Sequence, residues 1–240
     1  MPQTSDISGK DHLREALRLA AEDGLDAACQ TIEAAGDAIV VASAYKDFIQ
    51  ALYREQKNVQ QMLDAGRRAI GFALDQADSA KTEEPARLKQ IAAMISYNIG
   101  ANTWPGWGDA VDISADQRHA GREMAALSLR LVQELKLGPP KLGGRHWLIG
   151  AHHIAERRLE PALAALEAAA RAFAEAGDRP SEMMTRGYCA LARKLSPNQR
   201  PAAQLELDEV LHRLGQEASK SAVFYRDQIM MADRILCPGS

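Results

Sequence analysis

The sequence predicts an all-α protein built from antiparallel helix hairpins that stack in chain order. Hydrophobic residues make up 46% of the 240 residues, and alanine, the strongest helix former, supplies much of that share, as in residues 164–174. Long runs of β-branched residues are missing, and the only short one is Ile39-Val40-Val41. Glycine, proline and polar residues divide the chain into about eleven helical segments, and short connections make such segments antiparallel neighbours.

Polar and glycine-containing segments divide the first half of the chain into predicted helices. Residues 1–9 have no helical pattern, and we expect a disordered lead. Gly24 and the pair Gly36-Asp37 end the first two helical segments, and Pro85 suits the first position of a helix after a polar connection. The expected helices cover residues 10–23, 25–35, 38–56, 58–77 and 85–103.

The second half contains the loop 104–109, Trp-Pro-Gly-Trp-Gly-Asp, in which proline and glycine cannot continue a helix. Ser114 can then cap the next helix. The segment 138–144, GPPKLGG, is predicted to be a linker between N-terminal hairpins over 10–137 and C-terminal hairpins with a capping helix over 145–236, within one continuous array. The expected helices cover residues 115–137, 145–157, 160–176, 181–195, 199–216 and 218–236.

The net charge, the hydrophobic runs and the cysteine content indicate which kinds of partner and which compartment to expect. Lys and Arg number 29 and Asp and Glu 32, so the net charge is −3, whereas a nucleic-acid-binding protein usually carries a basic excess. No stretch approaches the ~18 apolar residues of a membrane helix, and residues 1–15 lack the apolar core of a signal peptide. Cys29, Cys189 and Cys237 are widely spaced, which favours free thiols in a reducing compartment. We therefore expect a cytoplasmic protein with neither nucleic acid nor membrane as a partner.

One hairpin carries a recognisable pattern. Helix 145–157 holds Trp147, Ile149-Gly150 and His153, and the next helix holds Ala162, Leu166 and Ala169. Residues 97–100, Tyr-Asn-Ile-Gly, repeat the beginning of this pattern, and residues 43–76 repeat it more loosely. The pattern resembles the tetratricopeptide-repeat family. The resemblance implies a short α-solenoid that binds a peptide or protein segment in the groove lined by the first helix of each hairpin, with Gly100 and Gly150 where helices approach closely.

The resemblance also assigns residues to that groove. Its projecting positions hold one basic side chain, aromatic rings and small alanines, and aromatic side chains often anchor interfaces. Asn98 matches one of five residues with which a subgroup of the family holds a C-terminal carboxylate; the other four differ, so no such clamp is expected. The expected ligand-binding groove consists of Arg54, Tyr97, Asn98, Trp104, Trp107 and Trp147.

Other interpretations remain open. Tyr97 and Trp147 could be core residues between hairpins, and the tryptophans of the loop 104–116 could plug the end of the array. His146, His153 and Glu156 share one helix stripe and are weak candidates for metal ligands, but a single helix supplies few ligands, so no metal or other cofactor is expected.

No nucleophile motif or phosphate-binding glycine loop is present, which favours a non-enzymatic binding protein. One alternative is a small-ligand-binding or metal-dependent enzyme that uses residues 97–109 and 146–156. Another is a self-associating scaffold, a homo-oligomer in which the last helix covers a neighbouring copy.

Overall fold

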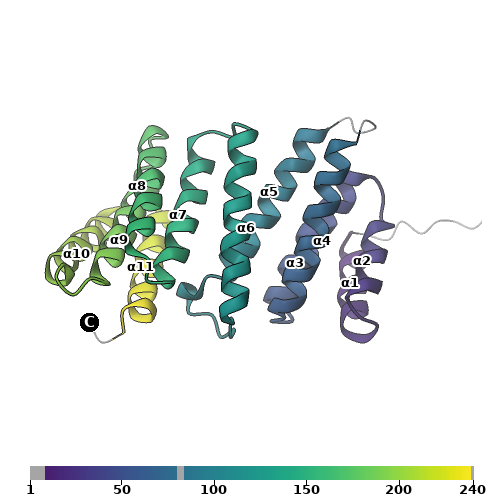
Figure 1. Cartoon of the computed structure of the whole chain (residues 1–240), viewed down its shortest axis with the longest axis horizontal. Helices are drawn as coiled ribbons and strands as arrows, with labels where there is room; N and C mark the ends of the chain where they lie inside the picture. The colour runs from purple at the N-terminus through teal and green to yellow at the C-terminus, as the bar shows by residue number, and fades with distance from the viewer. Residues whose placement is uncertain (1–8, 80–83, 239–240) are drawn as a thin grey trace, which may run out of the picture. The chain divides into compact units, whose positions relative to one another are not determined.

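The computed structural model describes residues 9–79 and 84–238, and this part of the chain is helical with short connections (Figure 1). Within it, eleven α-helices and one short 3-10 helix, η1, follow one another. Helices that are neighbours in the sequence pack together, as expected for stacked hairpins. The all-α prediction is therefore confirmed. Of the expected lead, residues 1–8 lie outside the described residues, and Gly9 already begins the first helix.

The chain divides into two compact units, Met1–Ile99 and Gly100–Ser240, with the boundary inside helix α5. In the first unit, α1 packs on α2, and α3 packs on α4 and on α1. Phe48 and Met62 lie fully buried in its core. The helices of this unit are α1 (Gly9–Glu22), α2 (Leu25–Glu33), α3 (Ala38–Arg54), α4 (Val59–Asp78) and the main part of α5 (Pro85–Asn102).

The second unit continues the same order of neighbours. Each helix from α6 to α10 packs on the one that follows it, and α11 packs on both α9 and α10. Its elements are η1 (Pro105–Trp107), α6 (Ala115–Glu134), α7 (Pro139–Ala155), α8 (Leu159–Glu175), α9 (Arg179–Lys194), α10 (Arg200–Gln216) and α11 (Lys220–Leu236).

Local sequence signals explain where several helices begin. The Asp37 side chain accepts hydrogen bonds from the first amides of α3, and the Asn58 side chain does the same for α4. Ser114 and Gln117 form a capping box at α6, so the cap predicted at Ser114 is confirmed. These side chains satisfy amides that have no partner within the helix.

The segment predicted as a linker belongs to a helix. Helix α7 begins at Pro139 and includes residues 139–144, whereas the sequence predicted a helix only from about residue 145. Gly138 adopts φ +83° at the N-cap, and the two prolines occupy the first helical positions, where a missing amide hydrogen costs nothing. The boundary between the two compact units lies between Ile99 and Gly100. The continuity of the helical array from one unit to the other stays a prediction.

The two glycines singled out by the repeat pattern lie at close helix contacts, as predicted. A Cβ atom added at Gly100 would lie 3.1 Å from the carbonyl oxygen of Gly121 on α6. A Cβ atom added at Gly150 would lie 2.6 Å from Leu166 on α8. Glycine inside a helix costs about 1 kcal/mol relative to alanine, and at both positions the close approach of the next helix explains it.

Helix α11 runs alongside α9 in the same direction. Its Tyr225 hydroxyl lies 3.1 Å from Ser181 Oγ near the start of α9, and its Asp233 carboxylate lies 2.6 Å from Lys194 Nζ at the end of α9. Between these contacts, Ile229 covers Gly187. Among the described residues, every helix is too short or too polar to cross a lipid bilayer.

Candidate functional site

The three tryptophans predicted for the groove contact one another in the second unit, where Trp107 is half-buried and the other two are buried. Trp104 is 1% exposed and Trp147 is 4% exposed. Their ring centroids are 5.8 Å apart, and Trp107 lies 5.0 Å from Trp104 and 6.1 Å from Trp147. Such tilted and edge-to-face contacts suit packed aromatic rings. Trp104 and Trp147 are therefore core residues, as in the packing alternative, and they do not line an open groove.

The loop between α5 and α6 is folded onto α7. Trp104 Nε1 donates a hydrogen bond to the carbonyl oxygen of Ala151 at 3.0 Å, and Trp107 Nε1 donates to the carbonyl oxygen of Ala101 at 2.7 Å. Gly106 lies so close to the Trp104 ring that a Cβ atom would come within 2.2 Å of it. The chain's own rings thus occupy the side of α7 that the repeat pattern assigns to a ligand.

Tyr188 on α9 completes this aromatic cluster and was not among the predicted site residues. Its ring centroid lies 5.3 Å from that of Trp147 and 5.8 Å from that of Trp104. The signal that could have found it is the preceding residue, Gly187, because a glycine inside a predicted helix marks a close helix contact. A Cβ atom at Gly187 would lie 2.7 Å from Ile229 of α11.

Three polar atoms beside this cluster are buried without a hydrogen-bond partner among the described residues: Trp147 Nε1, the Tyr188 hydroxyl and Gln228 Oε1. Burial raises the pKa of Tyr188 well above its ordinary value, while the nearby Gln228 amide acts in the opposite direction. The Tyr188 hydroxyl therefore stays protonated at neutral pH.

The weak metal-ligand candidates lie on and beside α7. Glu156 accepts a hydrogen bond from Arg122 Nε at 2.8 Å, and His153 Nδ1 lies 3.7 Å from the Glu156 carboxylate. Burial alone would raise the pKa of Glu156, but Arg122, His153 and Arg158 together outweigh it and the pKa is lowered. Burial also lowers the pKa of His146 and of His153. Within the described ranges, no three His, Cys, Asp or Glu side chains are grouped so that they could hold a metal ion.

His152, next to these candidates, has a structural role. It is fully buried, and its Nε2 lies 2.9 Å from the carbonyl oxygen of Gly100, to which a neutral imidazole donates. Burial lowers the pKa of His152 to about 4, although the hydrogen bond to Gly100 acts in the opposite direction. The side chain is therefore neutral near pH 7 and joins the end of α5 to α7.

The other predicted groove residues lie in the first unit. Arg54 is exposed at the end of α3, and Tyr97 and Asn98 are half-buried on α5. The face of α3 that ends at Arg54 also carries Val40 and Asp47, because residues seven apart on a helix share a face.

This face of α3 lines a hollow of about 420 Å³ within the first unit, which we call the α1–α3 hollow. Most of its side chains are apolar, and Val40 is 47% exposed. Asp47 and Arg87 are the charged residues among those that line it. The lining residues are His12, Leu13 and Ala16 of α1; Thr31, Ile32 and Ala35 in and after α2; Ile39, Val40, Ser43, Ala44, Asp47 and Phe48 of α3; and Arg87 of α5.

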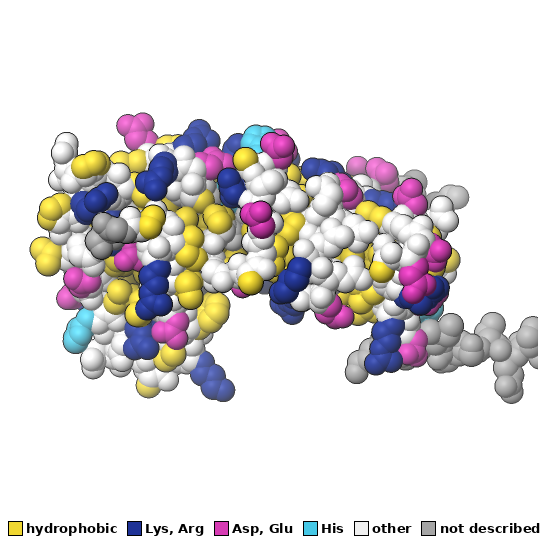
Figure 2. All heavy atoms as spheres, turned by 90° about the horizontal axis from the view of Figure 1, so that it is seen from below, with side chains coloured by type: hydrophobic (Ala, Val, Ile, Leu, Met, Phe, Trp, Pro, Cys, Tyr) yellow, Lys and Arg dark blue, Asp and Glu magenta, His cyan; other side chains and the backbone are white. Residues whose placement is uncertain are grey.

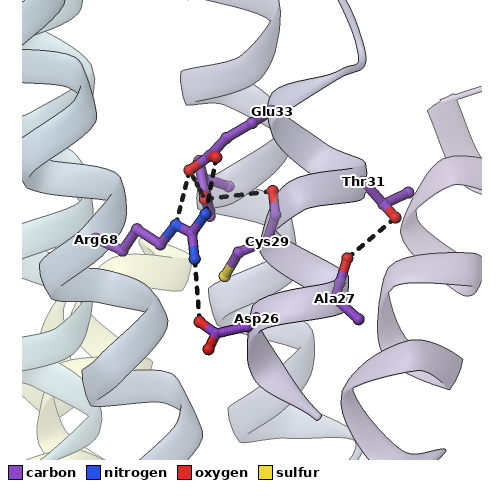
Figure 3. A network of polar contacts seen from close by, with 7 residues as sticks. Asp26, Ala27, Cys29, Thr31, Glu33 and Arg68 are labelled. Atoms are coloured by element: carbon purple, nitrogen blue, oxygen red, sulfur yellow. Dashed lines mark hydrogen bonds and ion pairs between the residues drawn. The ribbon is translucent and has the colours of Figure 1, made fainter. Parts of the chain in front are cut away.

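A polar network fixes the α2 wall of this hollow (Figure 3). Arg68 of α4 donates two hydrogen bonds to Glu33, at 2.7 and 2.8 Å, and a third to Asp26 at 3.2 Å. The buried Tyr45 hydroxyl donates to Glu33 at 2.6 Å. Hydrogen bonding from Arg68 lowers the pKa of Glu33, so the carboxylate stays charged. Because bidentate pairs of this kind are strong, α2 is held firmly against α3 and α4.

A second hollow, of about 560 Å³, lies between α8, α9 and α10. Its charges are largely paired, as in Arg193 with Glu206 and Arg213 with Glu209, each at 2.6 Å. Burial raises the pKa of Cys189, which lines this hollow, to about 11, so that thiol is protonated near pH 7. Basic and acidic side chains are likewise interspersed on the face shown in Figure 2. This pattern fits the weak net charge of the chain.

Comparison with protein-family models finds no match, and comparison with the curated proteins finds none either. The likeness to tetratricopeptide repeats therefore remains a resemblance in pattern. What the structure adds to it is the sequential packing of eleven helices in the described residues.

Proposed function

We propose that this chain is a non-enzymatic binding protein that takes an apolar segment of a partner protein into the α1–α3 hollow. The observation that carries this proposal is an apolar hollow between the first helices of two successive hairpins, α1 and α3. In a tetratricopeptide-like array, which we infer for these hairpins, that is where a peptide binds. We also expect the protein to act in the cytoplasm, because none of its three cysteines forms a disulfide.

The size and lining of the hollow suggest what the segment carries. About 420 Å³ lies within the range of ligand sites and would receive a few aliphatic side chains. Val40 and Met94 are exposed large apolar residues in this unit, at 47% and 40%. Met94 follows Arg87 by seven residues on α5, so the two share a face. An amphipathic helix whose apolar face enters the hollow suits this arrangement.

The charged residues suggest how the segment would be oriented. Asp47 and Arg87 have exposed side chains, and their present partners, Lys46 and Glu84, lie close by on the surface at 3.3 and 2.9 Å. Exposed pairs of this kind contribute little stability and exchange readily. A partner with a basic residue facing Asp47 and an acidic residue facing Arg87 would complement both.

The rigidity of the walls also supports binding. The network of Arg68, Glu33 and Tyr45 holds α2 in place without a ligand. A preformed site loses less conformational entropy when it binds. In the second unit, by contrast, the loop with Trp104 and Trp107 already covers α7.

Selection of peptides from a random library on the immobilised protein tests the proposal. We expect enriched peptides with two aliphatic residues one helical turn apart. Val40→Glu should weaken their binding, measured by isothermal titration calorimetry, by about tenfold or more, because it places a charge in the hollow. Leu205→Glu is the matched control, since Leu205 is 73% exposed on α10 and lies outside the hollow. Enriched peptides that bind Val40→Glu as tightly as the wild type would refute the proposal.

A further inference from the structure

Exposed apolar side chains are concentrated on the last helix. Of the seven large hydrophobic residues that are exposed in the described part of the chain, four lie on α11. They are Val223, Phe224, Met230 and Met231, with exposed fractions between 37% and 57%. Single exposed apolar residues need no explanation, but four on one helix of 17 residues do.

Val223 and Met230 lie on the side of α11 opposite its buried residues, whereas Met231, although 37% exposed, also approaches Gly108 at the end of η1. Ala222, Ile229 and Leu236 are buried and repeat every seven residues, which defines the inward face. Val223 and Met230 repeat in the same way on the outer face. The terminal helix of a stacked array normally presents a polar outer face to water. The outer face of α11 therefore resembles a contact surface more than a solvated end.

Two charges on this face, Asp227 and Arg234, are placed symmetrically about the two methionines, while Lys220 at the start of α11 has no such counterpart. Asp227 precedes Met230 by three residues, and Arg234 follows Met231 by three. Both charged side chains are exposed. Asp227 pairs with the adjacent Arg226 at 3.3 Å, and Arg234 makes no ion pair within the described residues. A second α11 laid antiparallel on the first would place Asp227 of each copy opposite Arg234 of the other.

We propose that a second copy of this chain docks on the outer face of α11, antiparallel and with Met230 against Met231. The two-fold symmetry of such a dimer repeats the pairing of Asp227 with Arg234 twice and covers the exposed methionines. The inference does not depend on the proposed peptide binding, because the α1–α3 hollow and α11 share no residues.

A lipid surface is the alternative occupant, since an apolar face with basic residues can lie on a membrane. Two features favour a second copy. Asp227 lies in the middle of the apolar face, where anionic lipid headgroups would repel it. The symmetric placement of one acid and one base allows two ion pairs in a two-fold contact, whereas a membrane offers no such pairing.

The expected dimer is weak. α11 is 17 residues long, about 25 Å, and a contact between two such helices falls in the small class of interfaces. Association should therefore appear at micromolar concentrations. Sedimentation velocity of the full chain, from about 5 to about 300 μM, measures it directly.

Charge reversal supplies the decisive comparison. Asp227→Arg and Arg234→Asp should each weaken the dimer by about tenfold or more, because each places like charges opposite one another twice. The double variant, Asp227→Arg with Arg234→Asp, should restore it. Asp208→Arg, an exposed reversal on α10, is the matched control and should change nothing. Circular dichroism confirms that each variant is folded.

Three outcomes would overturn the proposal. The wild type would be monomeric at every concentration, or the single reversals would dimerise as well as the wild type, or the double reversal would fail to restore the dimer. Flotation with anionic phosphatidylserine vesicles separates the alternatives, because binding by a protein that stays monomeric would assign the face to a lipid surface.

Discussion

The ammonium group of Lys194 lies 2.6 Å from the Asp233 carboxylate, although Lys194 is only 1% exposed. The pair joins the end of α9 to α11 and is the charged counterpart of the Ser181–Tyr225 contact at the other end of the two helices. A buried lysine keeps its charge at low cost only when an acid stays beside it. Removing Asp233 alone would therefore leave a buried charge without its partner where α11 packs on α9.

We expect opposite results from the two ways of disrupting this pair. Asp233→Ala leaves a buried charge without its partner and should lower the unfolding free energy by about 2–3 kcal/mol. Lys194→Met replaces the charge with an apolar chain of similar length and should cost less than about 1 kcal/mol. Urea denaturation measures both. Glu209→Ala, which removes an exposed pair with Arg213, is the control and should cost less than about 0.5 kcal/mol. Equal losses for Asp233→Ala and Lys194→Met would contradict this explanation.

The stability of the protein should fall as the pH falls from 6.5 toward 4. His152 has a pKa of about 4 in the folded protein against an ordinary value of 6.5. Between these values the unfolded chain binds a proton that the folded protein does not, so acid favours unfolding. The contribution is fully present above about pH 6.5 and amounts to about 3 kcal/mol lost by pH 4.

Urea denaturation between pH 7.5 and pH 4 measures this slope. His146 and His153 change stability in the same direction because burial lowers their pKa values too. His152→Asn removes only the contribution of His152, so its unfolding free energy should depend less steeply on pH than that of the wild type. Identical slopes would rule out the buried imidazole as the cause.

Two tyrosines should respond differently to the loss of their hydroxyl groups. The Tyr188 hydroxyl is buried without a partner among the described residues, so Tyr188→Phe should change the unfolding free energy by less than about 0.5 kcal/mol or increase it. The Tyr45 hydroxyl donates to the charged Glu33 at 2.6 Å, so Tyr45→Phe should cost about 2 kcal/mol. Thermal unfolding compares the two. A large loss for Tyr188→Phe would show that its hydroxyl has a partner.

The turn between α7 and α8 contains a strained residue. Arg157 adopts φ +58°, a left-handed conformation that costs a residue with a side chain about 1 kcal/mol relative to glycine. In the next turn, Gly177 takes the corresponding conformation at φ +68°. Arg157→Gly should therefore raise the unfolding free energy by about 1 kcal/mol. Arg157→Ala is the control, because it removes the same side chain but keeps the Cβ atom and so should gain nothing.

The helical periodicity of apolar residues, together with the glycines and prolines that end helices, predicted the order of the helices but not every helix boundary. Ser114 capped the expected helix because capping is a local interaction. Pro139 was misinterpreted because proline suits both a linker and the first turn of a helix, and only the packing of Gly143 against Phe173 distinguishes them. Such packing depends on residues far away in the chain.

The groove was harder to predict for the same reason. A repeat pattern shows which face of α7 carries Trp147, but not what covers that face. Trp104 lies 47 residues before Ala151, whose carbonyl oxygen accepts its hydrogen bond. Conversely, Val40 and Ala44 line the α1–α3 hollow. Small and aliphatic residues of this kind are expected in a protein core, so the sequence alone does not mark them as part of a binding site.

The position of the tryptophans also determines which unit an optical measurement of unfolding reports on. All three of them lie in the unit that begins at Gly100, in one cluster of contacting rings, while the unit that ends at Ile99 has none. Intrinsic tryptophan emission therefore reports on the second unit alone, whereas far-ultraviolet circular dichroism records the helices of both. If the two signals change at different denaturant concentrations, the helices of the first unit unfold separately from the second unit, because the two units differ in stability.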